Sequence, residues 1–155
     1  NDFMALLQMR PDQPEESRAV EWVAYASNAF NTMVPFYANV ERTPEYLANT
    51  TGTVSTDNFY WTSRLIAAMA DASYNKSLFH LERYEEAVLS AARALVNQYD
   101  AKLAAEPDAA RRAALREEAN TAIAAMLQEK AADTLDKVLF ELSSQMKNAY
   151  SRSDA

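Results

Sequence analysis

The stretch LFHLERYEEAVLSAARALVNQYDAKLAAE, residues 78–106, decides the fold class of this chain. Its apolar residues recur at intervals of three and four, which places them along one stripe of an α-helix. Pro107 and Asp108 then end the helix and open the next segment. The stretch predicts one long amphipathic helix packed against a core. Its stripe consists of Leu81, Tyr84, Val88, Ala92, Leu95, Tyr99 and Leu103.

The residues after Pro107 keep the same period with no proline or glycine, so they are also expected to be helical. Ordinary helix lengths favour two end-to-end helices with a break near Lys130 over one very long helix. The apolar stripe consists of Leu115, Ala119, Ile123, Met126, Leu127, Ala131, Leu135, Val138, Leu139, Leu142, Met146 and Tyr150.

A shorter helix is expected near residue 55, where Ser55, Thr56 or Asp57 can supply the N-cap. The consecutive aromatic residues 59–61 cannot all face one core, because neighbours on a helix diverge by about 100°. Residues 55–155 are therefore predicted to form a helical region. The stripe of its first helix is expected at Trp61, Leu65, Ala68 or Met69, and Ala72.

Residues 1–54 are predicted to be rich in β-strands, because apolar residues alternate there with a period of two. In the stretch 3–10 both faces are mostly apolar, which indicates a strand covered on both sides. A second strand is expected at 19–26. A third, at 33–40, contains Pro35, which cannot donate to a ladder and favours a sheet edge or a bulge. The chain is thus expected to be α+β and mostly helical, with two or three strands followed by three or four helices.

The composition excludes several classes of function. A formal charge of -7 repels phosphate backbones and anionic lipid, so neither nucleic acid nor a membrane surface is an expected partner. No apolar run approaches the ~20 residues that span a bilayer. The chain of 155 residues contains no cysteine and one glycine. It therefore offers no thiolate ligand, cysteine nucleophile, phosphate-binding glycine loop or Gly-x-Ser-x-Gly elbow.

His80 is the only histidine, which limits metal and acid–base chemistry. A di-iron carboxylate site would need two Glu-x-x-His pairs on facing helices. No metal site is therefore expected, and His80 is interpreted as a surface or capping residue. The residues alone indicate no self-contained catalytic set.

Short motifs spread over nearly the whole chain carry a resemblance to a known family. They are Leu7-Gln8-Met9-Arg10-Pro11, Val20-Glu21-Trp22, Val34-Pro35-Phe36-Tyr37 with Thr43-Pro44, Asp57-Asn58-Phe59-Tyr60-Trp61 with Arg64-Leu65, Tyr84-Glu85, and the final residues 146–155. In order and spacing they resemble the C-terminal third of the PepD-like bacterial dipeptidases, a branch of the N-terminal-nucleophile hydrolases.

The resemblance implies a parent enzyme that hydrolyses dipeptides with broad side-chain tolerance. Its nucleophile would be an N-terminal cysteine whose own α-amino group acts as general base. The parent fold would be a four-layer αββα sandwich, with no metal or organic cofactor. Because this chain has no cysteine, the nucleophile would lie outside it, and the isolated chain is expected to be inactive.

Several further expectations follow from treating the chain as a portion of that enzyme. The apolar start at Phe3 without an initiator methionine leads us to expect a truncated or processed product, with a natural start as the alternative. The expected partners are a dipeptide substrate, the missing N-terminal portion and further copies in a homo-oligomer. The expected location is the cytoplasm. The alternative is a helical protein-interaction or oligomerisation module without enzymatic activity, favoured by the long striped helices and the acidic surface.

Five polar residues are weak candidates for lining the parent's substrate site: Arg10, Asn28, Asn31, Tyr37 and Asn58. They stand at expected strand ends or at a helix start. Side chains at such positions can act as oxyanion donors or bind the charged termini of a dipeptide. For each of them, ordinary loop or capping duty is the more frequent role.

Overall fold

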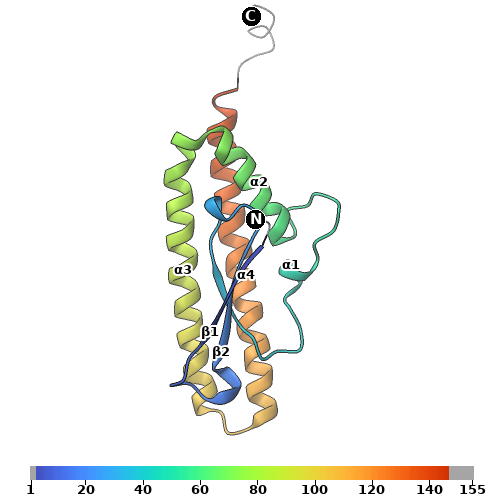
Figure 1. The fold of residues 1–155 in the computed structure, drawn as a ribbon, viewed down its shortest axis with the longest axis vertical. Coiled ribbons are helices and arrows are strands. Elements are labelled where there is room, and N and C mark those ends of the chain that lie inside the picture. Colours follow the sequence, from blue (N-terminus) through green and yellow to red (C-terminus); the bar gives the residue numbers. More distant parts are fainter. Residues whose placement is uncertain (1–2, 147–155) are drawn as a thin grey trace, which may run out of the picture.

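The computed structural model describes residues 3–146, with every side chain in that range except that of Asn28. It confirms the α+β class: a three-stranded antiparallel sheet is followed by helices (Figure 1). The elements are β1 (Phe3–Met9), the 3-10 helix η1 (Glu15–Ser17), β2 (Ala19–Tyr25), the 3-10 helix η2 (Asn28–Phe30), β3 (Val34–Tyr37), α1 (Glu45–Ala48), α2 (Phe59–Ala72), α3 (Tyr74–Ala105) and α4 (Ala109–Ser143).

The two long helices α3 and α4 run side by side along the length of the molecule, and the sheet lies against them (Figure 1). The strand order is β1-β2-β3, so β3 is an edge strand, as Pro35 predicts. In the register, Pro35 lies opposite Trp22 of β2. The proline therefore occupies a position where its missing N–H is tolerated.

Residues that lie opposite each other in the register share a face of the sheet. The helix side of the sheet, defined by Val20, Trp22, Ala24 and Tyr37, packs against α3 and α4. The Glu21 side is the opposite face. It is defined by Phe3, Ala5, Leu7, Met9, Ala19, Glu21, Val23, Tyr25, Val34 and Phe36.

Helices α1 and α2 cover β3 and the Val23 part of β2 on the Glu21 side. Val34 and Phe36 are buried there in one core with Tyr46 of α1 and Phe59 of α2. Strand β1, by contrast, is exposed along its whole length on both faces. The described residues thus do not supply the cover that the apolar pattern of β1 predicts.

The expected break near Lys130 is wrong, because α4 is one continuous helix of 35 residues. Asp108 caps it, its side chain accepting a hydrogen bond from the Arg111 N–H. The buried stripe passes the expected break through Leu127 and Ala131 without a change of face. Helix α3, with 32 residues, provides a packing surface along this length, so ordinary length statistics do not apply.

The predicted stripe of α2 is also wrong. The buried residues are Phe59, Thr62, Ser63, Ile66, Ala67 and Ala70. Hydroxyl groups explain the difference: Thr62 Oγ1 donates to the Asn58 carbonyl at 2.8 Å, so a polar side chain is satisfied while it is buried. Of the three consecutive aromatic residues only Phe59 is fully buried, and the Trp61 Nε1–H donates to the Thr51 carbonyl instead.

Helix α3 was expected from residue 78 but begins at Tyr74. Its first turn buries Ser77, whose hydroxyl lies 2.6 Å from that of Ser73. Helix α1 and the two 3-10 helices are too short for a periodic pattern to predict. Among residues 3–146, no helix combines the length and apolar character that crossing a membrane requires.

Candidate functional site

Arg10 and Tyr37 meet at one end of the sheet around Asp100 of α3. Arg10 follows β1 and donates two hydrogen bonds to the Asp100 carboxylate, at 2.7 and 3.1 Å. It also donates to the Ser17 carbonyl at 2.6 Å. The Tyr37 hydroxyl donates to Asp100 Oδ1 at 2.7 Å. Such two-pronged arginine–carboxylate pairing is strong and directional, so it fixes β1, β3 and α3 relative to one another.

The electrostatics of this cluster indicate a structural role. Burial raises the pKa of Tyr37, and its hydrogen bond to Asp100 raises it further, so the phenol stays neutral. Burial by itself would lower the pKa of Arg10, but the hydrogen bonds and charge of Asp100 outweigh it and raise the pKa. Neither the neutral Tyr37 phenol nor the Arg10–Asp100 ion pair offers a group that could take a proton from a substrate near neutral pH.

Asn120 of α4 binds the backbone of Tyr37 from the other side. Its Oδ1 accepts from the Tyr37 N–H at 2.8 Å, and its Nδ2 donates to the Tyr37 carbonyl at 3.0 Å. The side chain therefore replaces a neighbouring strand at the edge of β3. Asp100 and Asn120 were not predicted as partners. The sequence does contain a signal for them, since each is a polar residue directly after a position of the apolar stripe. Asp100 follows Tyr99, and Asn120 follows Ala119.

Asn31 lies at the opposite end of the sheet, after β2. Its Nδ2 donates to the Tyr25 carbonyl and, at 3.0 Å, to Ser63 Oγ of α2, while its Oδ1 accepts from the Thr32 N–H. The same turn contains Ala26, which is fully buried with a φ of 62°. A residue other than glycine in the left-handed region is strained, and the Asn31 contacts help to hold the turn in that conformation.

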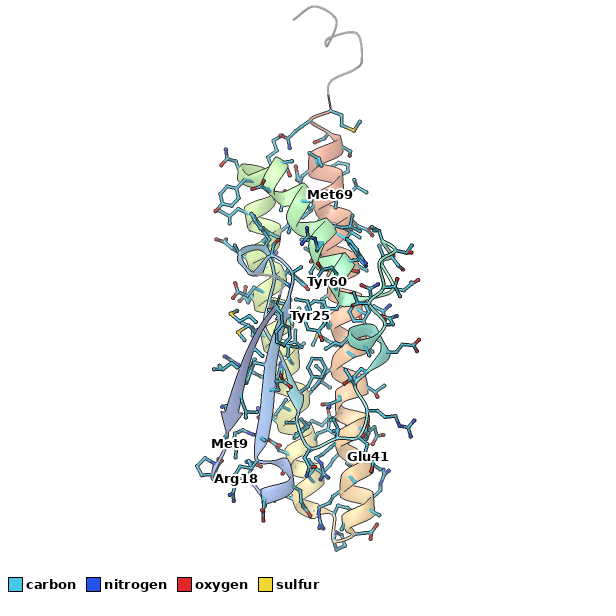
Figure 2. All side chains as sticks on the ribbon, turned by 45° about the vertical axis from the view of Figure 1, so that its right-hand side comes forward. Met9, Arg18, Tyr25, Glu41, Tyr60 and Met69 are labelled. Atoms are coloured by element: carbon cyan, nitrogen blue, oxygen red, sulfur yellow. The ribbon has the colours of Figure 1, made fainter. Side chains whose placement is uncertain are left out.

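Asn58 is the N-cap of α2. Its Oδ1 accepts a hydrogen bond from the Trp61 N–H at 2.9 Å, and the residue is buried. Asn28 contributes its backbone to η2, and its side chain is outside the described structure. The five candidates therefore do not converge on one point. Figure 2 shows the two ends of the sheet, with Met9 and Arg18 at one and Tyr25 at the other.

A cavity of about 240 Å³ opens on the Glu21 side of the sheet. Phe3 and Tyr25 lie in its wall with their ring centroids 5.6 Å apart, and Phe36 lines it as well. Glu21 is in the same wall, and Arg42 and Thr43 line the cavity from the loop before α1. Burial raises the pKa of Tyr25, and the nearby Glu21 charge raises it further.

Larger cavities than this lie away from the sheet. One of about 700 Å³ lies between the loop 39–45 and α4, where the Glu117 carboxylate accepts from the backbone N–H groups of Glu41 and Arg42. Another, of about 470 Å³, lies between α3 and α4 beside His80, which is 3.2 Å from Glu141. Within residues 3–146 no group of three or more His, Asp or Glu side chains is arranged to hold a metal ion.

Comparison with known proteins gives one consistent result. Residues 1–87 match peptidase family C69. Probable dipeptidase A of Streptococcus pyogenes serotype M18 (strain MGAS8232) is 42% identical over 150 residues, which cover 97% of this chain and 31% of that protein. A dipeptidase of Bifidobacterium longum (strain NCC 2705) is 35% identical over 188 residues, covering 97% of this chain and 35% of that protein. The chain spans about a third of the length of these relatives.

Proposed function

This chain belongs to peptidase family C69, and on that premise we propose that it is the C-terminal portion of a bacterial dipeptidase. The observation that carries the proposal is the identity to dipeptidases across 97% of the chain, which spans only about a third of their length. The predicted resemblance is confirmed at the level of the family. The activity of the whole protein and its dipeptide substrates belong to the proposal, as does a cytoplasmic location.

The nucleophile of this dipeptidase is an N-terminal cysteine outside the chain, with its own α-amino group as general base. The chain itself contains no cysteine. Arg10, Tyr37 and Asp100, which meet at one end of the sheet, are bound to one another. The isolated chain is therefore inactive in this proposal, and no metal or organic cofactor takes part.

The missing N-terminal portion covers strand β1. Leu7 is 62% exposed and the other residues of β1 are also exposed, although nearly all of them are apolar. One edge of β1 has no neighbouring strand among the described residues. An apolar strand at an open edge favours pairing with another strand. In this proposal residues 1–54 belong to the parent sheet and residues 55–155 to the helical region of an αββα sandwich, of which residues 147–155 lie outside the described structure.

The five polar candidates support the walls of the site in this proposal. Arg10, Asn31, Tyr37 and Asn58 hold strand ends and a helix start through the contacts described above. Asn28 stands in the same turn as Asn31. Their replacement is expected to act on substrate binding through the position of the backbone.

Fragment reconstitution tests the proposed function. The full-length protein is expected to hydrolyse unmodified dipeptides, this chain alone to be inactive, and co-expression with the N-terminal portion to restore hydrolysis. The control is the same N-terminal portion with its first cysteine changed to serine, which should restore nothing. A full-length protein without dipeptidase activity would refute the proposal.

An oligomer contact is the second candidate role, and it is compatible with the first. Phe79 at the start of α3 and Leu139 and Phe140 near the end of α4 are all exposed. The His80–Glu141 contact shows that these ends lie at the same level of the molecule. Exposed aromatic residues gathered in this way are typical of protein–protein contacts.

A further inference from the structure

Glu21 is the one charged residue on the Glu21 side of the sheet as its register defines it. The β1 register places Leu7 opposite Glu21, and the β3 register places Phe36 opposite it. Ala19 and Val23 are its neighbours on the same face along β2. A carboxylate in the middle of an otherwise apolar face of a central strand breaks the pattern of that face.

The Glu21 carboxylate is not paired with a described group. Within residues 3–146 its side chain makes no hydrogen bond or ion pair with another described group. On one side Leu7 is open, and on the other Phe36 is buried under α1 and α2. The cavity of about 240 Å³ lies directly against Glu21. The carboxylate therefore borders space that is free to hold a ligand.

If the rest of the protein covers this face, the Glu21 carboxylate is removed from water and needs a cationic partner. The proposed function, on which this inference rests, brings a second layer over the apolar residues of β1 and β2. A carboxylate removed from water needs a cationic partner, since an unpaired buried charge costs several kcal/mol. Arg42 lines the same cavity, but within residues 3–146 it forms no ion pair with Glu21. The space between them leaves room for a small cationic ligand at the Glu21 carboxylate.

The substrate of a dipeptidase carries such a group, since every unmodified dipeptide has an α-ammonium at its N-terminus. We propose that Glu21 binds the α-ammonium group of the dipeptide substrate. The rings of Phe3, Tyr25 and Phe36 line the same cavity and provide an apolar wall for the first side chain. The volume is below the ~300–1,000 Å³ of complete ligand sites, as expected when the remaining wall comes from the missing portion.

The test is steady-state kinetics of the full-length dipeptidase carrying Glu21→Gln, which keeps the size of the side chain and removes its charge. For an unmodified dipeptide, KM is expected to rise about 10- to 100-fold with kcat nearly unchanged, because a charge-assisted hydrogen bond of the ground state is lost. An N-acetylated dipeptide has no ammonium group. Its inhibition constant against the same enzyme should change less than about twofold. The KM of Glu21→Asp, which keeps the charge, should lie between the KM of the wild type and that of Glu21→Gln.

Glu15→Gln is the matched control, because Glu15 is an exposed glutamate of η1 outside this cavity, and its KM should equal that of the wild type. An unchanged KM in Glu21→Gln would overturn the inference. Equal weakening of the free and the acetylated dipeptide, or failure of both Glu21 variants to fold, would show a structural role and overturn it as well. A wild-type protein without dipeptidase activity would instead refute the proposed function, and this inference with it.

Discussion

Asp100 is the residue through which three elements of the molecule are joined. It is on α3, and it accepts hydrogen bonds from Arg10, which follows β1, and from Tyr37 of β3. Both side chains of the ion pair are largely shielded, with 14% and 15% of their surface exposed. Removing one partner of such a shielded pair costs far more than removing one partner of an ion pair on the open surface, because it leaves the other charge shielded and unpaired.

We expect Asp100→Asn to lower the free energy of unfolding by about 2 kcal/mol, because Arg10 then keeps its charge without a charged partner. Urea denaturation of the protein measures the change. Asp133→Asn is the control, since the Asp133–Lys137 pair lies on the exposed face of α4, and its cost should stay below about 0.5 kcal/mol. Equal losses in the two variants would contradict this account of Asp100.

Asn120 plays the corresponding role between elements, because it attaches helix α4 to strand β3. Its carboxamide satisfies both the N–H and the carbonyl of Tyr37 and is fully buried. A side chain rather than a strand therefore completes the backbone hydrogen bonding of this sheet edge.

Asn120→Ala should cost about 3 kcal/mol of stability, because it leaves two backbone polar groups buried without partners. Hydrogen exchange measures where the effect lies. The Tyr37 amide should exchange faster in the variant than in the wild type, which would locate the effect at β3. Gln128→Ala on the exposed face of the same helix controls for helix propensity. A loss confined to α4, with β3 unaffected, would be the opposing result.

The elements also show what a sequence pattern can and cannot predict. The predicted stripe of α3 is buried except for Leu95, which is half-buried, because most buried positions of this helix are apolar. The buried Ser77 is polar and lies before the predicted start. The face of α2 was mistaken because Thr62 and Ser63 are buried, and apolar periodicity does not detect hydroxyls that bond within their own helix. The continuity of α4 depends on the length of its partner α3, which is a tertiary property.

For the five candidate site residues, too, the sequence predicts the local position but not the tertiary partner. Their places at strand ends and at a helix start were predicted, and Asn58 does cap α2. Their partners could not be predicted, because Asp100 and Asn120 are distant in sequence and come together only when α3 and α4 pack on the sheet. In the sequence Glu21 is one residue of the motif Val20-Glu21-Trp22 and has no distinguishing neighbour. Its isolation on an apolar face becomes visible once the strand register is known.

At the scale of the whole molecule, the exposed aromatic end of α3 and α4 is expected to contact another copy of the protein. Phe140 is 70% exposed, more than the other exposed aromatic residues Phe3, Tyr74 and Phe79. Burying such a ring in a symmetric interface removes a large apolar area from water.

Phe140→Glu should therefore shift the full-length dipeptidase from an oligomer to a smaller species, as measured by light scattering coupled to size-exclusion chromatography. Gln128→Glu adds the same charge at an exposed position of α4 and should leave the mass unchanged. A wild-type protein that is monomeric at tens of micromolar, or a Phe140→Glu variant of wild-type mass, would rule out this contact.

The open edge of β1 has a consequence for the order of events during synthesis. In the proposed dipeptidase, residues near the C-terminus are translated last, so the strand that β1 pairs with must wait for it. Pairings between segments so far apart in sequence form slowly, and the waiting edge is prone to aggregation. The pairing of β1 is therefore expected to be a late step in the folding of the whole protein.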